Sequence, residues 1–181
     1  MMNNWKIYKL SDIVEVTSSK RIYRQEYTSY GIPFYRGKEI IEKSKGNVVS
    51  TELFIPFERF KEIKEKFGAP AKDDILISSV GTIGTAFLVN RNFDFYFKDG
   101  NIIWLKNFKS YVLSKYVFYW IKSSYGQNKI KEITIGSTQQ ALTIVSLKNI
   151  EIPLPTLPTQ HRIAEILGAL DDKIELNLQM N

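Results

Sequence analysis

Three prolines near the C-terminal end set the strongest limit on how this chain can fold. Pro153, Pro155 and Pro158 fall within one short segment. Each proline removes a backbone donor and fixes φ, so the segment cannot lie inside a helix. We therefore predict a stiff, extended connector over residues 153–158. It separates a body, residues 1–152, from a terminal segment, residues 159–181.

The terminal segment carries a stripe with the spacing of a coiled coil. Its members follow one another in steps of four, three, four and three residues, which is typical of a helix seam with one polar layer. The stripe consists of Ile163, Leu167, Leu170, Ile174 and Asn177. Because an isolated helix of this length is marginal in water, we expect the stripe to pack on a partner helix.

The body mixes helical and strand patterns, which predicts an α/β (α+β mixed) fold: a twisted mixed sheet with flanking helices. Apolar residues at helical spacing predict helices over 56–67, ended by Gly68, and over 110–124. Short apolar runs between Gly, Pro and Asp residues predict strands. The predicted strands are 5–8, 32–37 (an edge or entry strand), 75–79, 85–89, 93–97 and 102–105, the last two forming a hairpin.

The charge is spread unevenly along the chain, whose net charge is +6. Residues 101–150 carry seven lysines against one acid, Glu132, and residues 1–50 carry nine basic against five acidic side chains. Residues 151–181 carry two basic and five acidic side chains. The body therefore favours an anionic partner, whereas the terminal segment favours a different one.

Several kinds of catalytic and metal site are disfavoured by the composition. The chain has no cysteine and one histidine, His161, so a zinc centre is not expected. Gly81 and Gly84 lack the Gly-Lys-Ser/Thr of a phosphate-binding loop and are interpreted as a sheet turn. The adjacent acids Asp73 and Asp74 diverge in regular structure, and we interpret them as solvated or capping residues. The chain is thus expected to be non-catalytic, with no metal or cofactor of its own.

The N-terminal residues show no signal-peptide pattern, and the longest apolar runs are far shorter than a membrane span. We therefore expect a cytoplasmic protein that does not enter a membrane.

Three motifs follow one another from the end of the body into the terminal segment. They are Gly136-Ser137-Thr138-Gln139-Gln140, Ile150-Glu151-Ile152-Pro153-Leu154-Pro155 and Gln160-His161-Arg162-Ile163-Ala164. This order of a Gly-Ser/Thr-Thr-Gln turn, a Pro-rich connector and a helix beginning with Gln and Arg-Ile resembles the specificity subunits of type I restriction-modification systems. The resemblance extends upstream to residues 31–36 and 74–84, and so spans nearly the whole chain.

The resemblance implies a DNA target recognition domain over 1–152, followed by a conserved helix over 159–181 that pairs with other subunits. Members of the family commonly hold two such domains and two such helices, and this chain has one of each. It therefore resembles half a subunit that forms a homodimer or pairs with a second half to read a bipartite site in double-stranded DNA. By resemblance its partners are methyltransferase and restriction subunits, which carry S-adenosylmethionine, ATP and Mg²⁺.

Residue type and loop position predict which side chains contact DNA. Arginine and lysine neutralise phosphates, and arginine, serine, threonine and glutamine read base edges. The predicted contacts are Lys20, Arg21, Arg24, Arg36, Lys38, Ser137, Thr138, Gln139 and Gln140. The two glutamines are equally compatible with a role in tying down the turn.

Two other functions remain open at this point. The chain is also compatible with an interaction or inhibitory module that competes for methyltransferase subunits through its terminal helix. The second alternative is that the chain is the recognition domain of a single-chain restriction-methylation enzyme.

Overall fold

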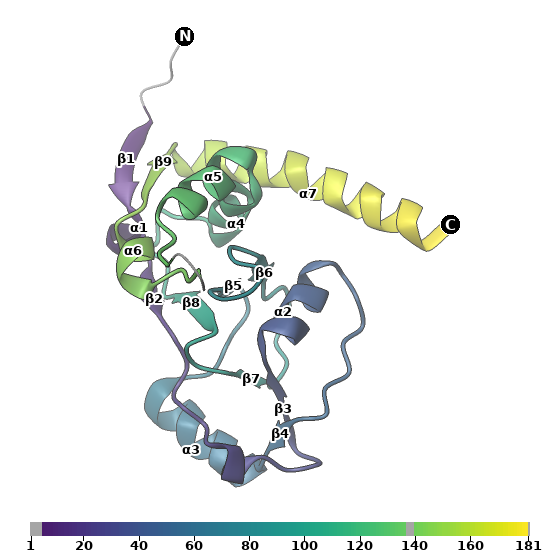
Figure 1. The fold of residues 1–181 in the computed structure, drawn as a ribbon. Coiled ribbons are helices and arrows are strands. Elements are labelled where there is room, and N and C mark those ends of the chain that lie inside the picture. The colour runs from purple at the N-terminus through teal and green to yellow at the C-terminus, as the bar shows by residue number, and fades with distance from the viewer. Residues whose placement is uncertain (1–4, 137–139, 181) are drawn as a thin grey trace.

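A four-stranded antiparallel sheet lies at the centre of the protein. The computed structural model describes residues 5–136 and 140–180 and is drawn in Figure 1. The strands of this sheet, in spatial order, are β2 (Glu15–Thr17), β8 (Ile102–Lys106), β5 (Ile75–Ser78) and β6 (Ala86–Leu88). β5 and β8 are buried on both faces, which explains their continuous apolar sequences.

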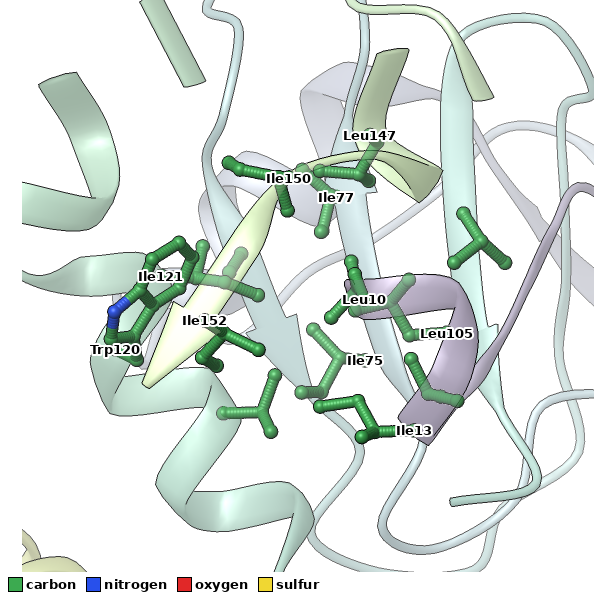
Figure 2. Packing of buried hydrophobic residues seen from close by; sticks show 14 of the residues in the cluster. Leu10, Ile13, Ile75, Ile77, Leu105, Trp120, Ile121, Leu147, Ile150 and Ile152 are labelled. Carbon is green, nitrogen blue, oxygen red and sulfur yellow. The ribbon is translucent and has the colours of Figure 1, made fainter. Parts of the chain in front are cut away.

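Alternate residues of β5 enter two different cores. Ile75 and Ile77 pack in the largest cluster, whereas Leu76 joins a second cluster on the other face. Figure 2 shows Ile75 and Ile77 among side chains of the helices and the strand that cover the first face. These elements are α1 (Leu10–Ile13), α4 (Ser114–Lys122), α6 (Ile144–Lys148) and β9 (Glu151–Leu154). The second face is covered by α2 (Gly37–Ser44).

A smaller three-stranded sheet lies at the end of the body remote from α4 (Figure 1). Its order is β4 (Phe54–Ile55), β3 (Ile32–Tyr35) and β7 (Tyr96–Phe97), next to α3 (Phe57–Phe67). β3 is the middle strand, so its prediction as an edge strand is wrong. Pro33 is tolerated because it pairs only with β4, while Phe34 and Tyr35 pair in parallel with β7.

The first and last strands of the body pair with each other. β1 (Lys6–Lys9) runs antiparallel to β9, and the amide of Leu10 donates to the carbonyl of Ile150 at 2.9 Å. Directly after β9 the chain enters α7 (Leu157–Met180), which passes over α4 and extends away from the body (Figure 1). The pairing fixes the point from which α7 leaves.

Most predicted elements are confirmed, and three more predictions need correction. The predicted hairpin over 93–97 and 102–105 is wrong, because β7 pairs with β3 while β8 pairs with β2 and β5. The predicted helix over 110–124 is shorter, since Ser123 separates α4 from α5 (Ser124–Glu132).

The predicted connector over 153–158 is reduced to Pro155 and Thr156. β9 extends to Leu154, and the terminal helix begins at Leu157, ahead of residue 159. Pro158 lies in the first turn of that helix, where proline is tolerated.

The remaining element is the 3₁₀ helix η1 (Arg24–Glu26). Among the residues that the structure describes, no helix combines the length and apolarity needed to cross a membrane.

Candidate nucleic-acid interface

Three loops and the start of α2 meet at one end of the central sheet. A shallow hollow of about 620 Å³ is lined by Arg36, Lys38, Thr82 and Asn101, among others. A second hollow of about 320 Å³ is lined by Asn128, Lys131 and Gln140, and the two share Gly81. Apolar side chains line both hollows as well, and the acid Glu42 lines the first. We call the following lining residues the loop surface: Arg36, Lys38, Gly81, Thr82, Asn101, Asn128, Lys131 and Gln140.

Two buried serines at the end of β5 hold the loops together. The Ser78 hydroxyl donates to the carbonyl of Thr82 and accepts from the amide of Thr85 at 3.0 Å. The Ser79 hydroxyl donates to the carbonyl of Gly100 at 3.0 Å, and its own carbonyl accepts from the amide of Leu142 at 2.9 Å. Both serines are almost fully buried, whereas Thr82 and Gly100, whose carbonyls accept these bonds, belong to exposed turns. The serine hydroxyls therefore anchor the exposed turns to the sheet from beneath.

The glycine turn between β5 and β6 is held from the other side by α5. Gly84 has φ +81°, and a Cβ there would lie 3.1 Å from Ile130 and 3.2 Å from Gln127. The Gln127 amide donates to the carbonyls of Gly84 at 3.1 Å and Ile121 at 2.7 Å. The turn therefore needs glycine, and its shape is built into the fold. This agrees with its prediction as a sheet turn.

Arg36 is oriented by a buried carboxylate. Its Nη2 lies 2.7 Å from Glu39 Oε1, and its backbone amide donates to Glu39 Oε2 at 2.8 Å. Burial opposes ionisation of Glu39, but the hydrogen bonds from Arg36 outweigh it and lower the pKa of Glu39. The carboxylate therefore stays charged, and the Arg36 side chain remains 43% exposed beside the N-terminus of α2. A fixed, half-exposed guanidinium is suited to an anionic partner.

Arg21 lies at the border of the loop surface. Its Nε is 2.8 Å from Asp99 Oδ2, and Asp99 belongs to the same turn as Asn101. The neighbouring segment is tied to this turn too, because the Ser18 hydroxyl donates to the carbonyl of Ile102 and that of Ser19 to the carbonyl of Phe97. The structure thus brings Arg21 and Arg36 toward the same end of the body.

The other predicted contacts are placed differently. Lys20 is exposed, and its ammonium group lies 5.1 Å from the Phe67 ring at the end of α3. Arg24 is exposed in η1, away from the glycine turn. Gln140 is exposed and lines the second hollow. Ser137, Thr138 and Gln139 lie outside the described residues, so their contacts stay a prediction.

The predicted stripe on α7 is divided between two environments. Ile163 packs against the largest core cluster and Leu167 is half-buried, so the first part of the stripe contacts the chain's own body. Leu170 and Ile174 are 51% and 57% exposed, and Asn177 is also exposed. Ile166 at 56% completes an exposed face with i, i+4 spacing that the heptad pattern missed. We call Ile166, Leu170 and Ile174 the outer face of α7.

Asp74 contradicts its interpretation as a solvated or capping residue. It is 8% exposed and accepts from Trp104 Nε1 at 2.8 Å and from the amide of Ala71 at 2.9 Å. Burial outweighs these bonds and raises the pKa of Asp74. It is a structural residue of the second core cluster. Across residues 5–136 and 140–180, no group of three or more His, Cys, Asp or Glu side chains is arranged to hold a metal ion.

Sequence reasoning missed the residues that support the loop surface. Ser78 and Ser79 are buried and Gln127 is partly buried, and serine at a strand end is too common to stand out. Asn101 and Thr82 were not among the predicted DNA contacts either. The available signal was the crowding of Gly, Ser and Asp around 78–84 and 98–101, which is typical of loops that converge.

Comparisons with known proteins identify the family of the chain. A model of the type I restriction modification DNA specificity domain matches residues 2–181. The Haemophilus influenzae protein S.HindORF215P is 37% identical over 172 residues, covering 94% of this chain and 40% of that protein. The MjaIX specificity subunit of Methanocaldococcus jannaschii is 30% identical, covering 98% of this chain and 40% of the relative. The chain thus spans about two fifths of the length of these relatives.

The fold has a counterpart among solved structures. The S subunit from M. genitalium superposes with a TM-score of 0.64 at 22% identity, covering 97% of this chain and 42% of that one. This likeness confirms the predicted fold class, a mixed α/β body with a long C-terminal helix. Because the family model matches residues 2–181, the protein belongs to the type I restriction-modification DNA specificity domain family.

Proposed function

We propose that this chain recognises a DNA sequence on behalf of a type I restriction-modification enzyme. The observation that carries the proposal is the loop surface, where basic and amide side chains from distant parts of the sequence converge on a framework of buried hydrogen bonds. Arg36, Lys38 and Lys131 supply positive charge for phosphates. Asn101, Asn128 and Gln140 supply the paired donors and acceptors that read base edges.

The outer face of α7 supports a second role in assembly. Three apolar side chains, each more than half exposed, repeat at i, i+4 spacing on a helix that leaves the body. Such a face is suited to another helix. We propose that it pairs with a second recognition segment, either in a second copy or in another chain, so that two loop surfaces read the two parts of a bipartite site.

The proposed division of labour leaves chemistry to other subunits. Relatives are named as specificity subunits of restriction enzymes, and we propose that this chain likewise positions methyltransferase and restriction subunits on DNA in the cytoplasm. S-adenosylmethionine, ATP and Mg²⁺ would then be bound by those partners. The chain itself would perform no catalysis.

Titration against duplexes tests the proposal. The chain with its methyltransferase partner is titrated against a target-bearing duplex, identified by mapping methylated sites in cells that carry the genes, and against a scrambled duplex. We expect tighter binding to the target and a steep loss of affinity with salt. Equal affinity for both duplexes would refute sequence recognition.

The exposed face of α7 also favours the second candidate, a module that only competes for methyltransferase subunits. Arg36→Ala separates the two. In a recognition subunit this variant loses DNA affinity and keeps partner binding, whereas in a competitor it changes neither.

A further inference from the structure

We infer that Gln160 is a positioning residue that fixes the direction of α7 relative to the loop surface, and thereby the spacing of the two half-sites. The part of this inference that concerns spacing rests on the proposed function. The part that concerns direction rests on the structure of this chain alone.

Gln160 is a fully buried polar side chain with three hydrogen bonds to main-chain groups. Its exposed fraction is 0%. Its Nε2 donates to the carbonyls of Tyr111 at 3.0 Å and Pro155 at 2.9 Å, and its Oε1 accepts from the amide of Leu113 at 2.8 Å. Leu113 is the residue from which α4 starts. One amide group therefore joins the first turn of α7, the segment before it and the start of α4.

Glutamine is the side chain that this position requires. Two carbonyls need donors and one amide needs an acceptor, and the primary amide supplies both at one end of a flexible chain. An ionised glutamate supplies no donor, and an apolar side chain leaves all three main-chain groups unpaired in a buried place. The contact is thus specific in geometry as well as favourable in energy.

Two further features relate α7 to α4 farther along. A Cβ at Gly168 would lie 2.7 Å from Lys115 Nζ and 3.6 Å from the Tyr119 hydroxyl, so the ends of two α4 side chains lie over this glycine. Asp171 Oδ2 is 3.0 Å from Lys122 Nζ. At 1.5 Å per residue, the contacts from Gln160 to Asp171 cover about 16 Å of the helix. They determine its tilt as well as its starting point.

The held helix is connected rigidly to the loop surface. Val117 and Ile121 of α4 pack in the same core cluster as Ile75 and Ile77 of β5. β5 ends at Ser78, and it is followed by Ser79; these are the two serines that hold the loops. A change in the position of α7 on α4 therefore changes the direction of its outer face relative to the loop surface.

A small tilt is large on the scale of DNA. A helix of 24 residues is about 36 Å long, and a tilt of about 10° moves its far end by about 6 Å. Successive base pairs are about 3.4 Å apart. If α7 were free to tilt in this way, the distance between two half-sites would vary by about one to two base pairs.

Distance measurements test the direction of α7 without DNA. The chain has no cysteine, so Lys61→Cys on α3 and Lys173→Cys on α7 give two exposed spin-label sites. Labelled chain is mixed with excess unlabelled chain, and the distance is measured by pulsed electron paramagnetic resonance. We expect a narrow distribution in the parent and a broadened or shifted one in Gln160→Met, which keeps the side-chain length but none of the three bonds.

Two further variants separate positioning from stability. Ile63→Ala opens a cavity under α3, far from α7, and should lower the melting temperature without changing the spacing of methylated half-sites. Gly168→Leu wedges α7 away from α4 while Gln160 is intact, and should shift the distance and the spacing. A loss of stability alone in Gln160→Met, with the parent's distance distribution, would overturn the inference.

Methylation mapping with the partner subunits tests the spacing. The parent is expected to give one spacing between methylated half-sites, and Gln160→Met to give several or a shifted one. If the parent methylates no bipartite site, the proposed function fails, and the distance measurement alone decides the role of Gln160. If the parent does so and Gln160→Met keeps both distance and spacing, only the present inference fails.

Discussion

The loop surface and the outer face of α7 are both exposed, but they are supported in opposite ways. The loop surface consists of polar side chains held from beneath by buried hydrogen bonds of Ser78, Ser79 and Gln127. The outer face consists of apolar side chains on a helix whose far end leaves the body (Figure 1). The first is organised in advance for a polar ligand, and the second becomes buried only when another protein covers it.

This difference suits the two proposed roles, DNA recognition and subunit assembly. A surface that reads bases needs fixed donors and acceptors, and rigid support reduces the entropy lost on binding. A helix that joins subunits needs apolar area and a defined direction. If the loop surface binds DNA as proposed, the acidic character of residues 151–181 would repel DNA from α7.

The largest effect is expected from Leu170→Asp combined with Ile174→Asp. Burying each side chain in a helix interface contributes about 1.5–3 kcal/mol, so the double variant should weaken association by more than about a hundredfold. Sedimentation with and without the methyltransferase partner measures this. The melting temperature should hardly change, because both side chains are already more than half exposed. Unchanged association, relative to a Glu165→Ala control, would show that the outer face is not an interface.

A smaller effect, on the loop surface and not on α7, is expected from Ser79→Ala. The variant removes the donor to the carbonyl of Gly100. Because Gly100 is exposed, water can replace that donor, and the loss of folding free energy should be about 1 kcal/mol. Target DNA affinity, followed by fluorescence anisotropy, should fall roughly tenfold because the loops are no longer fixed. Ser110→Ala removes an exposed hydroxyl and serves as control. A variant with parental DNA affinity would show that the serine bonds do not organise the surface.

Each lysine of the loop surface should contribute less to DNA affinity than Ser79 does. Lys38→Ala and Lys131→Ala are expected to weaken binding severalfold on every duplex, and each should reduce the slope of log affinity against log salt by about one. Both lysines are exposed, so folding should be unaffected. Lys61→Ala on α3 is the matched control. If Lys38→Ala and Lys131→Ala keep the parental salt slope as the control does, the phosphates are bound elsewhere.

The smallest expected effect is a pH dependence of stability. It is due to Asp74, which lies in the body and in neither of the two surfaces. Burial raises the pKa of Asp74, so the folded chain binds this proton more tightly than the unfolded one. The stability of the parent relative to Asp74→Asn should therefore be greatest in acid and decline as pH rises from about 4 through the raised folded pKa. Unfolding of both proteins across pH measures the difference, and a difference independent of pH would contradict it.

Local pattern was enough to predict the strongest elements of the fold. Residues 57–67 and the strands at 75–78 and 86–88 follow from apolar spacing and from Gly or Asp at their ends. The pairing of β7 with β3 could not be predicted, because the Asp99-Gly100 turn is equally compatible with a hairpin. Which strand accepts β7 depends on the tertiary packing of Phe97 and Trp104, whose rings meet edge to face at 5.8 Å.

The candidate site was predictable only in part, for a similar reason. Residue type located exposed basic and amide groups such as Arg36, Lys38 and Gln140, but the buried groups beneath them carry no such signal. On α7 the heptad pattern included Ile163 and omitted Ile166. The small residues Ala164 and Gly168 mark the face that the body covers, and a pattern built on large apolar residues does not weigh small ones.

The pairing of β1 with β9 also has a consequence for folding. The two strands come from opposite ends of the body's sequence, and such non-local contacts form slowly. Until they form, the start of α7 is not held in place. Association through the helix before the body has folded would join chains without a set geometry, so correct assembly is expected to follow closure of this strand pair.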